Sequence, residues 1–343
     1  MKSLQLLSLA ALAAGSPIGS IQEYTRILKA RQSDTSFTTT QAELNNFQFY
    51  SQYAGASYCN SATPAGQAVT CADNVCPDVA GTVVNSFTAS NSGSVTGIGG
   101  FVAVDSAHQL IVLSVRGSNN LRNFITDVVF AFTDCSFADG CEVHDGFNDA
   151  WNEIADAATA AISQAVAANP GFKIVTTGHS LGGAVATLAA ATLRTQGYNI
   201  DIYTYGSPRV GNDVFANFVT AQPGGEFRVT HFDDPVPRLP PILFDYRHVS
   251  PEYWLSTGSA TTIDYTISQI EVCTGIANTD CNAGTSGLDV SAHSYYLEDI
   301  SGCAPSAFQF KRDDGNSGYN QTVIDRINKW AEEDRALVAS GQA

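Results

Sequence analysis

The chain has 343 residues, of which 44% are hydrophobic and 15% are charged, a composition that predicts a globular protein of one large domain or two small ones. Its formal net charge is −16, so its surface should repel nucleic-acid phosphates and disfavour anionic membrane surfaces. We therefore expect no nucleic-acid partner, and we expect any interface to be neutral and to be entered through apolar contacts.

Residues 1–15 have the features of a secretory signal peptide, with Lys2 before a short apolar stretch and small residues at its end. This stretch is too short to span a membrane, and no other stretch is apolar enough, so the sequence predicts a secreted, extracellular protein with no transmembrane segment. Residues 16–31 end in Leu28-Lys29-Ala30-Arg31, and we expect a pro-segment that is removed after basic residues. A disordered N-terminal arm is the alternative.

Eight cysteines fit an oxidising destination. Three pairs are close in sequence and suggest local loops, which leaves one long-range pair, although eight cysteines allow 105 pairings. The expected bonds are Cys71–Cys76, Cys135–Cys141, Cys273–Cys281 and Cys59–Cys303. A zinc site is disfavoured because no CxxC pair occurs, and we expect no metal.

In chain order, the first elements are a helix over 41–58, strands over 83–88 and 97–104, and a buried strand over 109–115. Residues 119–132 place apolar side chains on one face at helical spacing, a pattern that most often marks a core helix. These side chains are Leu121, Phe124, Ile125, Val128 and Val129.

Strands and helices alternate in the middle of the chain, which predicts a mostly parallel central sheet flanked by helices. The expected elements are a helix over 147–168, a strand over 172–177, a helix from 181 to about 196, and strands over 201–205 and 226–231. Chemistry at such a sheet lies at the carboxyl ends of the strands. Ser118, Ser180 and Asp234 all follow strands directly.

Ser180 lies in Gly-x-Ser-x-Gly between a strand and a helix, the pattern of a nucleophile elbow. A serine nucleophile needs a histidine base and a carboxylate that orients it, in the chain order Ser, Asp or Glu, His. That order leaves His231, His248 and His293 open as the base, and it leaves Asp233 and Asp234 open as the carboxylate. The side chain of His179 should point away into a structural hydrogen bond.

Five ordered blocks within residues 41–303 resemble the filamentous-fungal lipases of the class 3 family. They are TGHSLGGA (177–184), YGSPRVGN (205–212), DPVPRLPP (234–241), SPEYW (250–254) and AHSYY (292–296). The resemblance implies an α/β-hydrolase-type fold with a helical lid, and a triad of Ser180, Asp234 and His293. It also implies an oxyanion hole formed by Ser118 and the N–H of Leu181.

The same resemblance implies that residues 119–132 are the lid, and the apolar face of this segment favours lipase over the related feruloyl esterases, whose lid is polar. It implies three of the disulfides, whereas Cys273–Cys281 rests on proximity alone. It implies no cofactor. We take residues 32–303 as the lipase catalytic domain.

Residues 304–343 form a C-terminal extension with a dibasic site at Lys311-Arg312 and a glycosylation sequence at Asn320. Val323, Ile327, Trp330 and Leu337 share one helical face. We expect a tail helix that covers the apolar cleft until cleavage after Arg312. A solvated, glycosylated tail is the alternative.

The sequence therefore predicts a secreted serine esterase, expected to be a monomer, that hydrolyses triacylglycerol to diacylglycerol and fatty acid at a lipid–water interface. The alternatives are a feruloyl or other soluble-ester esterase, a phospholipase activity of the same site, and a non-catalytic binding protein with the same fold.

Overall fold

The structure is a computed structural model that describes residues 38–72, 74–89, 95–118, 125, 130–304, 319 and 321–343. The expected signal peptide, pro-segment, dibasic site and Asn320 lie outside these residues, as do Leu121, Phe124, Val128 and Val129. None of the described helices is both long and apolar enough to cross a membrane.

Eight strands form one sheet in the order β1-β2-β3-β6-β7-β8-β9-β10. The strands are β1 (Val83–Ala89), β2 (Gly100–Asp105), β3 (Leu110–Val115), β6 (Lys173–His179), β7 (Ile200–Tyr205), β8 (Glu226–His231), β9 (Glu252–Leu255) and β10 (Ile270–Cys273). The five neighbours β3, β6, β7, β8 and β9 pair in parallel, whereas the pairs towards both edges of the sheet are antiparallel. A separate two-stranded sheet pairs β4 (Phe132–Asp134) with β5 (Glu142–His144).

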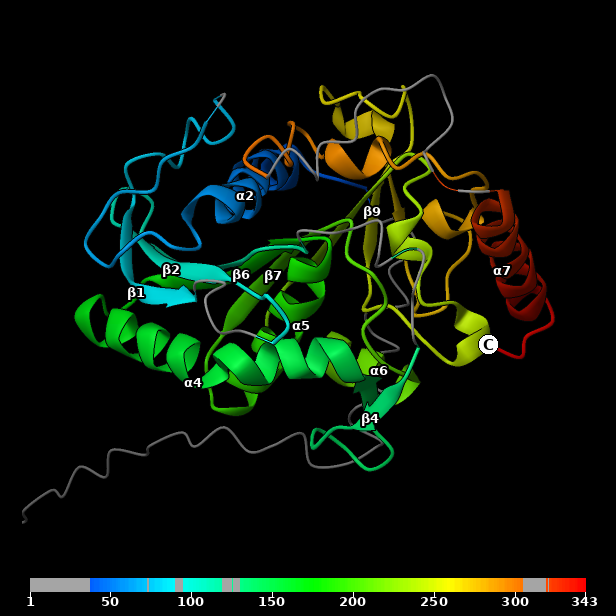
Figure 1. The fold of residues 1–343 in the computed structure, drawn as a ribbon, viewed down its shortest axis with the longest axis horizontal. Coiled ribbons are helices and arrows are strands. Elements are labelled where there is room, and N and C mark those ends of the chain that lie inside the picture. The colour runs from blue at the N-terminus through cyan, green and yellow to red at the C-terminus, as the bar shows by residue number, and fades with distance from the viewer. Residues whose placement is uncertain are drawn as a thin grey trace, which may run out of the picture.

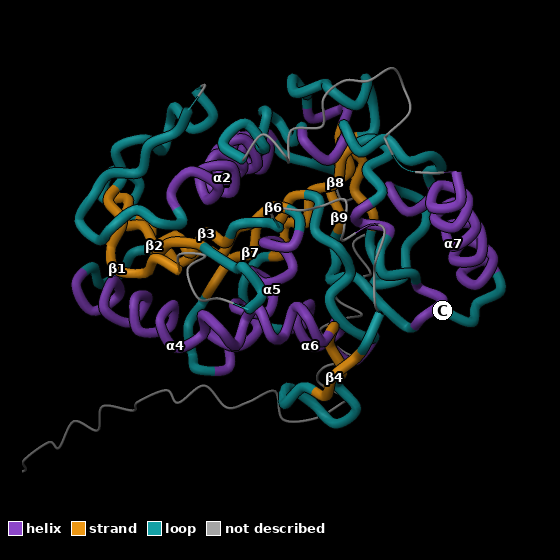
Figure 2. Tube along the Cα trace, in the orientation of Figure 1, coloured by secondary structure: helices purple, strands orange, loops and turns teal. Residues whose placement is uncertain are grey.

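Helices cover both faces of the large sheet (Figures 1 and 2). Helix α2 (Gln41–Asn60) lies on one face, and α4 (Asp145–Ala168), α5 (Leu181–Thr195) and α6 (Asp213–Ala221) lie on the other. Each face has its own hydrophobic core, because central parallel strands project apolar side chains in both directions. The mostly parallel sheet flanked by helices that the sequence predicts is therefore confirmed.

The expected element boundaries differ from the observed ones by a few residues. The strand expected from residue 97 begins at Gly100, because Gly97 adopts a φ of +69° that turns the chain before the strand. Strands β4, β5, β9 and β10 were not predicted, since they are only three or four residues long.

A third apolar cluster lies beside helix α7 (Gln321–Ala339), at the β9 end of the molecule (Figure 1). Helix α7 packs on two single-turn 3₁₀ helices, Ile242–Phe244 and Asn282–Gly284. This cluster also contains Ile125, the one described residue of the expected lid face.

All eight cysteines form disulfides, in the pairs that the sequence predicts. The bonds are Cys59–Cys303, Cys71–Cys76, Cys135–Cys141 and Cys273–Cys281. The first of them joins α2 to the end of the expected catalytic domain across a sequence separation of 244 residues.

Candidate active site

Ser180 lies at the turn between β6 and α5, with backbone angles φ 58° and ψ −130°. Residues other than glycine rarely adopt this conformation, and such strain clusters at functional sites. The turn needs glycines beside it: a Cβ on Gly178 would lie 2.3 Å from the backbone of Gly182, and a Cβ on Gly182 would lie 2.1 Å from the carbonyl oxygen of Val115. The strained turn therefore holds Ser180 at the carboxyl end of β6.

Asp234 and His293 form a buried pair. His293 Nδ1 lies 2.7 Å from Asp234 Oδ2, and the Val236 N–H donates to Asp234 Oδ1 over 2.9 Å. Tyr296 donates its hydroxyl to Asp234 Oδ2, and burial together with the carboxylate raises the pKa of Tyr296 well above its usual value. Since Nδ1 donates to Asp234, neutral His293 presents Nε2 as an acceptor, and this buried atom has no hydrogen-bond partner among the described residues.

The main chain at Ala292 and His293 is held by two other histidines. His179 Nε2 donates to the carbonyl oxygen of His293 over 2.7 Å, and His231 Nδ1 donates to that of Ala292 over 2.9 Å. Burial lowers the pKa of both side chains, so both are neutral near pH 7. His179 Nδ1 is also 2.8 Å from the Tyr58 hydroxyl, so the expected structural hydrogen bond of His179 is confirmed.

The structure separates the alternatives that chain order left open. His231 binds the Ala292 carbonyl, and His248 Nε2 donates to the carbonyl oxygen of Pro237 over 2.7 Å. Only His293 hydrogen-bonds to a carboxylate of the 233–234 pair within the described residues. Asp233 precedes Asp234 in the chain. Burial, reinforced by the charge of Asp289, raises the pKa of Asp233 to about 6.

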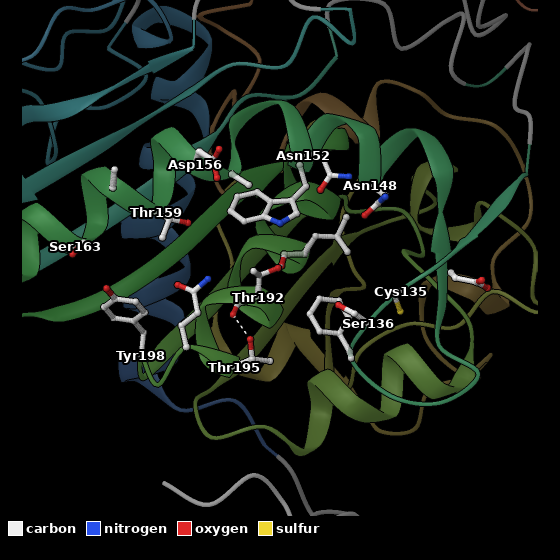
Figure 3. Close-up of a pocket in the computed structure, with 17 residues that line it drawn as sticks. Cys135, Ser136, Asn148, Asn152, Asp156, Thr159, Ser163, Thr192, Thr195 and Tyr198 are labelled. Carbon is white, nitrogen blue, oxygen red and sulfur yellow. Dashed lines mark hydrogen bonds between the residues drawn. The ribbon is translucent and has the colours of Figure 1, made fainter. Parts of the chain in front are cut away.

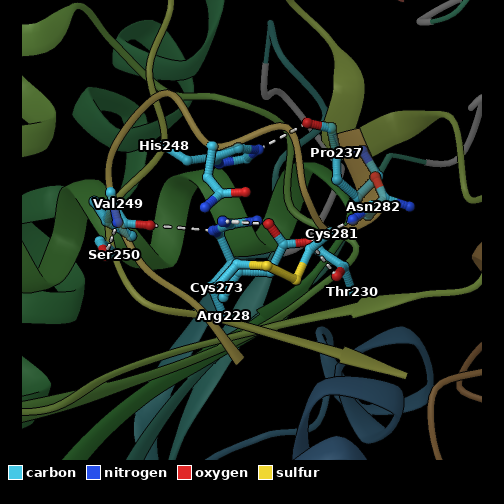
Figure 4. A network of polar contacts seen from close by, with 12 residues as sticks. Arg228, Thr230, Pro237, His248, Val249, Ser250, Cys273, Cys281 and Asn282 are labelled. Carbon is cyan, nitrogen blue, oxygen red and sulfur yellow. Dashed lines mark hydrogen bonds and ion pairs between the residues drawn. A yellow bond between two sulfur atoms is a disulfide. The ribbon is translucent and has the colours of Figure 1, made fainter. Parts of the chain in front are cut away.

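A buried polar network supports the loop that carries Asp234 (Figure 4). Arg228 forms an ion pair with Glu252, with a nitrogen–oxygen distance of 2.9 Å. Glu252 also accepts from the Asn282 N–H, and the Asn282 amide donates to the carbonyl oxygen of Asp234 over 3.1 Å. The Cys273–Cys281 disulfide ends directly before Asn282, so it fixes the residue that holds the Asp234 main chain.

The candidate oxyanion residues lie next to Ser180. A Cβ on Gly117 would lie 3.2 Å from the Ser180 Cβ, so the backbone before Ser118 passes directly beside the serine. Leu181 is the first residue of α5, where backbone N–H groups lack partners within the helix. A Cβ on Gly206 would lie 2.9 Å from the His293 ring, and the Ser180 N–H donates to the carbonyl oxygen of Tyr205. One segment therefore borders the His293 ring and the Ser180 main chain.

The site is closed to solvent. Ser180 is 1% exposed, and Asp234 and His293 are 0% exposed. Val236 and Val290, which flank the Asp234 and His293 loops, share an apolar cluster with Ile125. An open cavity of about 860 Å³ lies elsewhere, between α4 and the far end of α5, and is lined by residues that include Trp151 and Tyr198 (Figure 3). None of its lining residues is a predicted catalytic, oxyanion-hole or lid residue.

Sequence reasoning missed three residues that support this site. Tyr296 belongs to the AHSYY block, but nothing in that block shows which aromatic side chain reaches Asp234. His231 is open in the sequence as a base or as a structural hydrogen-bonder, but nothing local shows that it bonds to the main chain beside His293. Asn282 has no local signal.

A family model described as Lipase (class 3) matches residues 112–244, and another, described as Lipase 3 N-terminal region, matches residues 5–83. A secreted mono- and diacylglycerol lipase of Fusarium solani is 52% identical to the chain, and the match covers 98% of each protein. A secreted mono- and diacylglycerol lipase A of Penicillium cyclopium is 39% identical, over 83% of this chain and 92% of the relative.

Solved structures agree with these matches. The mono- and diacylglycerol lipase from Aspergillus oryzae is similar to this structure with a TM-score of 0.71 and 41% identity, over 77% of this chain and 99% of the other. A structure from a family of fungal lipases gives a TM-score of 0.72 and 36% identity, over 78% of this chain and 100% of the other. The predicted α/β-hydrolase-type fold is thereby confirmed, and the chain is an enzyme that belongs to the class 3 lipase family.

Proposed function

We propose that this enzyme hydrolyses the ester bonds of acylglycerols with Ser180 as nucleophile, His293 as general base and Asp234 as the carboxylate that orients the base. One observation carries this proposal: the buried Asp234–His293 pair lies at the carboxyl ends of the parallel strands, as the strained Ser180 turn does. A serine on a nucleophile elbow, a histidine whose Nε2 can accept its proton and a carboxylate that orients the histidine are the three parts that serine hydrolysis requires.

The reaction follows from this geometry. His293 Nε2 takes the proton of the Ser180 hydroxyl, whose oxygen attacks the ester carbonyl carbon and forms a tetrahedral oxyanion. Ser118 and the Leu181 N–H stabilise that oxyanion, and such donors contribute on the order of 3 kcal/mol each. Protonated His293 then gives its proton to the leaving glyceride alcohol, which leaves an acyl-enzyme. Water, activated by His293, releases the fatty acid and restores Ser180.

The names of the relatives bear on the substrate. The Fusarium solani and Penicillium cyclopium proteins are named for mono- and diacylglycerols, whereas the sequence alone suggests triacylglycerol. We propose that all three classes of acylglycerol enter one site and that the partial glycerides are the better substrates. The buried, apolar surroundings of Val236 and Val290 suit acyl chains.

We propose that residues 119–132 are the lid that closes this site, since Ile125 belongs to the same apolar cluster as Val236 and Val290, which lie near Asp234 and His293 in the chain. We also propose that the enzyme is secreted after removal of residues 1–15, because the Fusarium solani relative, which matches 98% of this chain, is named as secreted. Secretion and the removal of residues 1–15 are tested by the N-terminal sequence and the mass of protein collected from culture medium. The same two measurements show whether the chain is also cleaved after Arg31 and whether Asn320 carries a glycan.

Replacing Ser180 with Ala tests the reaction. Ser180→Ala should abolish hydrolysis of mono-, di- and triacylglycerol while the circular dichroism and melting temperature stay close to those of the wild type. Full activity in this variant would refute the assignment. The same panel, extended with a phospholipid and a soluble feruloyl ester, separates the substrate classes, and a higher wild-type rate on either added ester than on every acylglycerol would refute acylglycerols as the main substrate.

A further inference from the structure

The buried face of α7 includes one carboxylate. Val323, Ile327 and Ala331 continue a stripe along the helix, and the next position of this stripe is Asp334, whose side chain is 2% exposed. An acidic side chain at a core position is uncommon and requires partners. The burial of Asp334 therefore indicates a specific contact between the C-terminal helix and the catalytic domain.

The partner of Asp334 is Arg209, from the YGSPRVGN block. Arg209 Nη1 lies 3.1 Å from Asp334 Oδ2, and the Arg209 side chain is 1% exposed. The main-chain N–H groups of Ile242 and Leu243 donate to the two oxygens of Asp334 over 2.8 Å and 2.9 Å. Both oxygens of the buried carboxylate thus accept hydrogen bonds from the catalytic domain.

Arg209 in turn binds the loop that follows Asp234. Its Nη1 donates to the carbonyl oxygens of Arg238 and Pro240 over 2.7 Å and 2.8 Å, and its main-chain N–H donates to that of Leu239 over 2.8 Å. Three consecutive carbonyls of the loop are therefore held by one residue. The charge of that residue is balanced by Asp334 from α7.

The same helix also holds the segment that leads to His293. The Gly287 N–H donates to Asn328 Oδ1 over 3.1 Å, and Arg335 Nη1 donates to the carbonyl oxygen of Thr285 over 3.1 Å. Val290, three residues before His293, lies in the same apolar cluster as α7. Helix α7 thus bridges the two loops that carry Asp234 and His293, which are far apart in sequence.

We propose that α7 is a clamp that positions the Asp234 and His293 loops relative to each other, with Asp334 as its positioning residue. This role rests on the proposed function, since it acts through the Asp234–His293 pair. It differs from the removable cover that the sequence suggests, because a cover that leaves would take away the ion-pair partner of Arg209. Full activity therefore requires α7 in place.

The test is Asp334→Asn in the full-length chain, with Glu333→Gln as the matched control. Both changes remove one negative charge from adjacent positions of α7, but the Glu333 side chain is 39% exposed. Rates are measured on a soluble butyrate ester, so that lipid-interface binding does not enter, and kcat is expressed per active site titrated with a serine-reactive phosphonate. Asn328→Ala, which removes only the bond to Gly287, serves as a milder second variant.

For Asp334→Asn we expect kcat to fall about tenfold with little change in KM, since small misplacement of catalytic groups lowers rates by such factors. The acid limb of the pH–kcat/KM profile should move to lower pH, because a displaced Asp234 stabilises the His293 cation less. Asn328→Ala should show a smaller loss of the same kind, and Glu333→Gln should match the wild type.

A wild-type kcat per titrated site and an unchanged pH profile in Asp334→Asn and Asn328→Ala would overturn the positioning role, whatever the melting temperatures. Deletion of residues 321–343 that raises kcat would overturn it in favour of a cover. A wild-type enzyme that the phosphonate does not label would instead refute the proposed function, and the clamp with it.

Discussion

Replacement of Asp234 by Asn is the sharpest test of the catalytic pair. The Val236 N–H can only donate, so the oxygen of an asparagine at 234 should take the place of Oδ1. The amide NH₂ group then faces His293 Nδ1, where the wild type has an accepting oxygen 2.7 Å away. The amide donates to Nδ1, which moves the histidine proton to Nε2. In that tautomer His293 cannot accept the proton of Ser180.

The expected loss follows from this tautomer change and from the lost stabilisation of the histidine cation. The equivalent change in serine proteases lowers kcat about 10⁴-fold, which corresponds to about 5 kcal/mol of transition-state stabilisation. We expect a loss of this size for Asp234→Asn on a soluble butyrate ester between pH 5 and 9. Circular dichroism and the melting temperature of the same preparation establish that the fold is intact.

Asp233→Asn is the matched control, because it makes the same change one residue away, at a carboxylate that does not contact His293. It should keep kcat close to the wild type. If folded Asp234→Asn retains more than about a tenth of the wild-type kcat, a loss under about 1.4 kcal/mol, the reasoning is refuted. A larger loss in Asp233→Asn than in Asp234→Asn would show that the carboxylate is wrongly assigned.

Two further predictions concern stability. Burial is the main cause that raises the pKa of Asp233 from 3.8 to about 6. The folded state therefore binds the Asp233 proton more tightly than the unfolded state does. The stability that this proton contributes is present below about pH 4 and is lost as the pH rises to about 6. The melting temperature of Asp233→Asn, relative to that of the wild type, should therefore increase across this pH range. A difference in melting temperature that stays constant with pH would contradict the raised pKa. For the disulfides, the chain-entropy model gives about 5.5 kcal/mol for Cys59–Cys303 and about 2 kcal/mol for Cys71–Cys76, because their sequence separations are 244 and 5 residues. Double serine variants compared by urea denaturation should show the larger loss for the long-range bond, and an equal loss would contradict this account.

The sequence by itself determined the elements whose signals are local. The Ser180 elbow, its flanking glycines and the main strands and helices are visible because backbone sterics and hydrophobic periodicity act over a few residues. The order of Ser, Asp and His along the chain restricts the triad to a few candidates. Resemblance to a lipase family then selects among them, and the structure brings Asp234 and His293 together as that selection requires.

Only the tertiary structure decided which distant groups support the site. Periodicity places Trp330 and Leu337 on the inner face of the tail helix, but the fully buried stripe is Val323, Ile327, Ala331 and Asp334. An aspartate looks like a solvent-exposed residue in any sequence pattern. It becomes a core residue here because Arg209, 125 positions earlier, presents a buried cation at the same point in space. Such pairing depends on how elements pack, and no window of the sequence contains both partners.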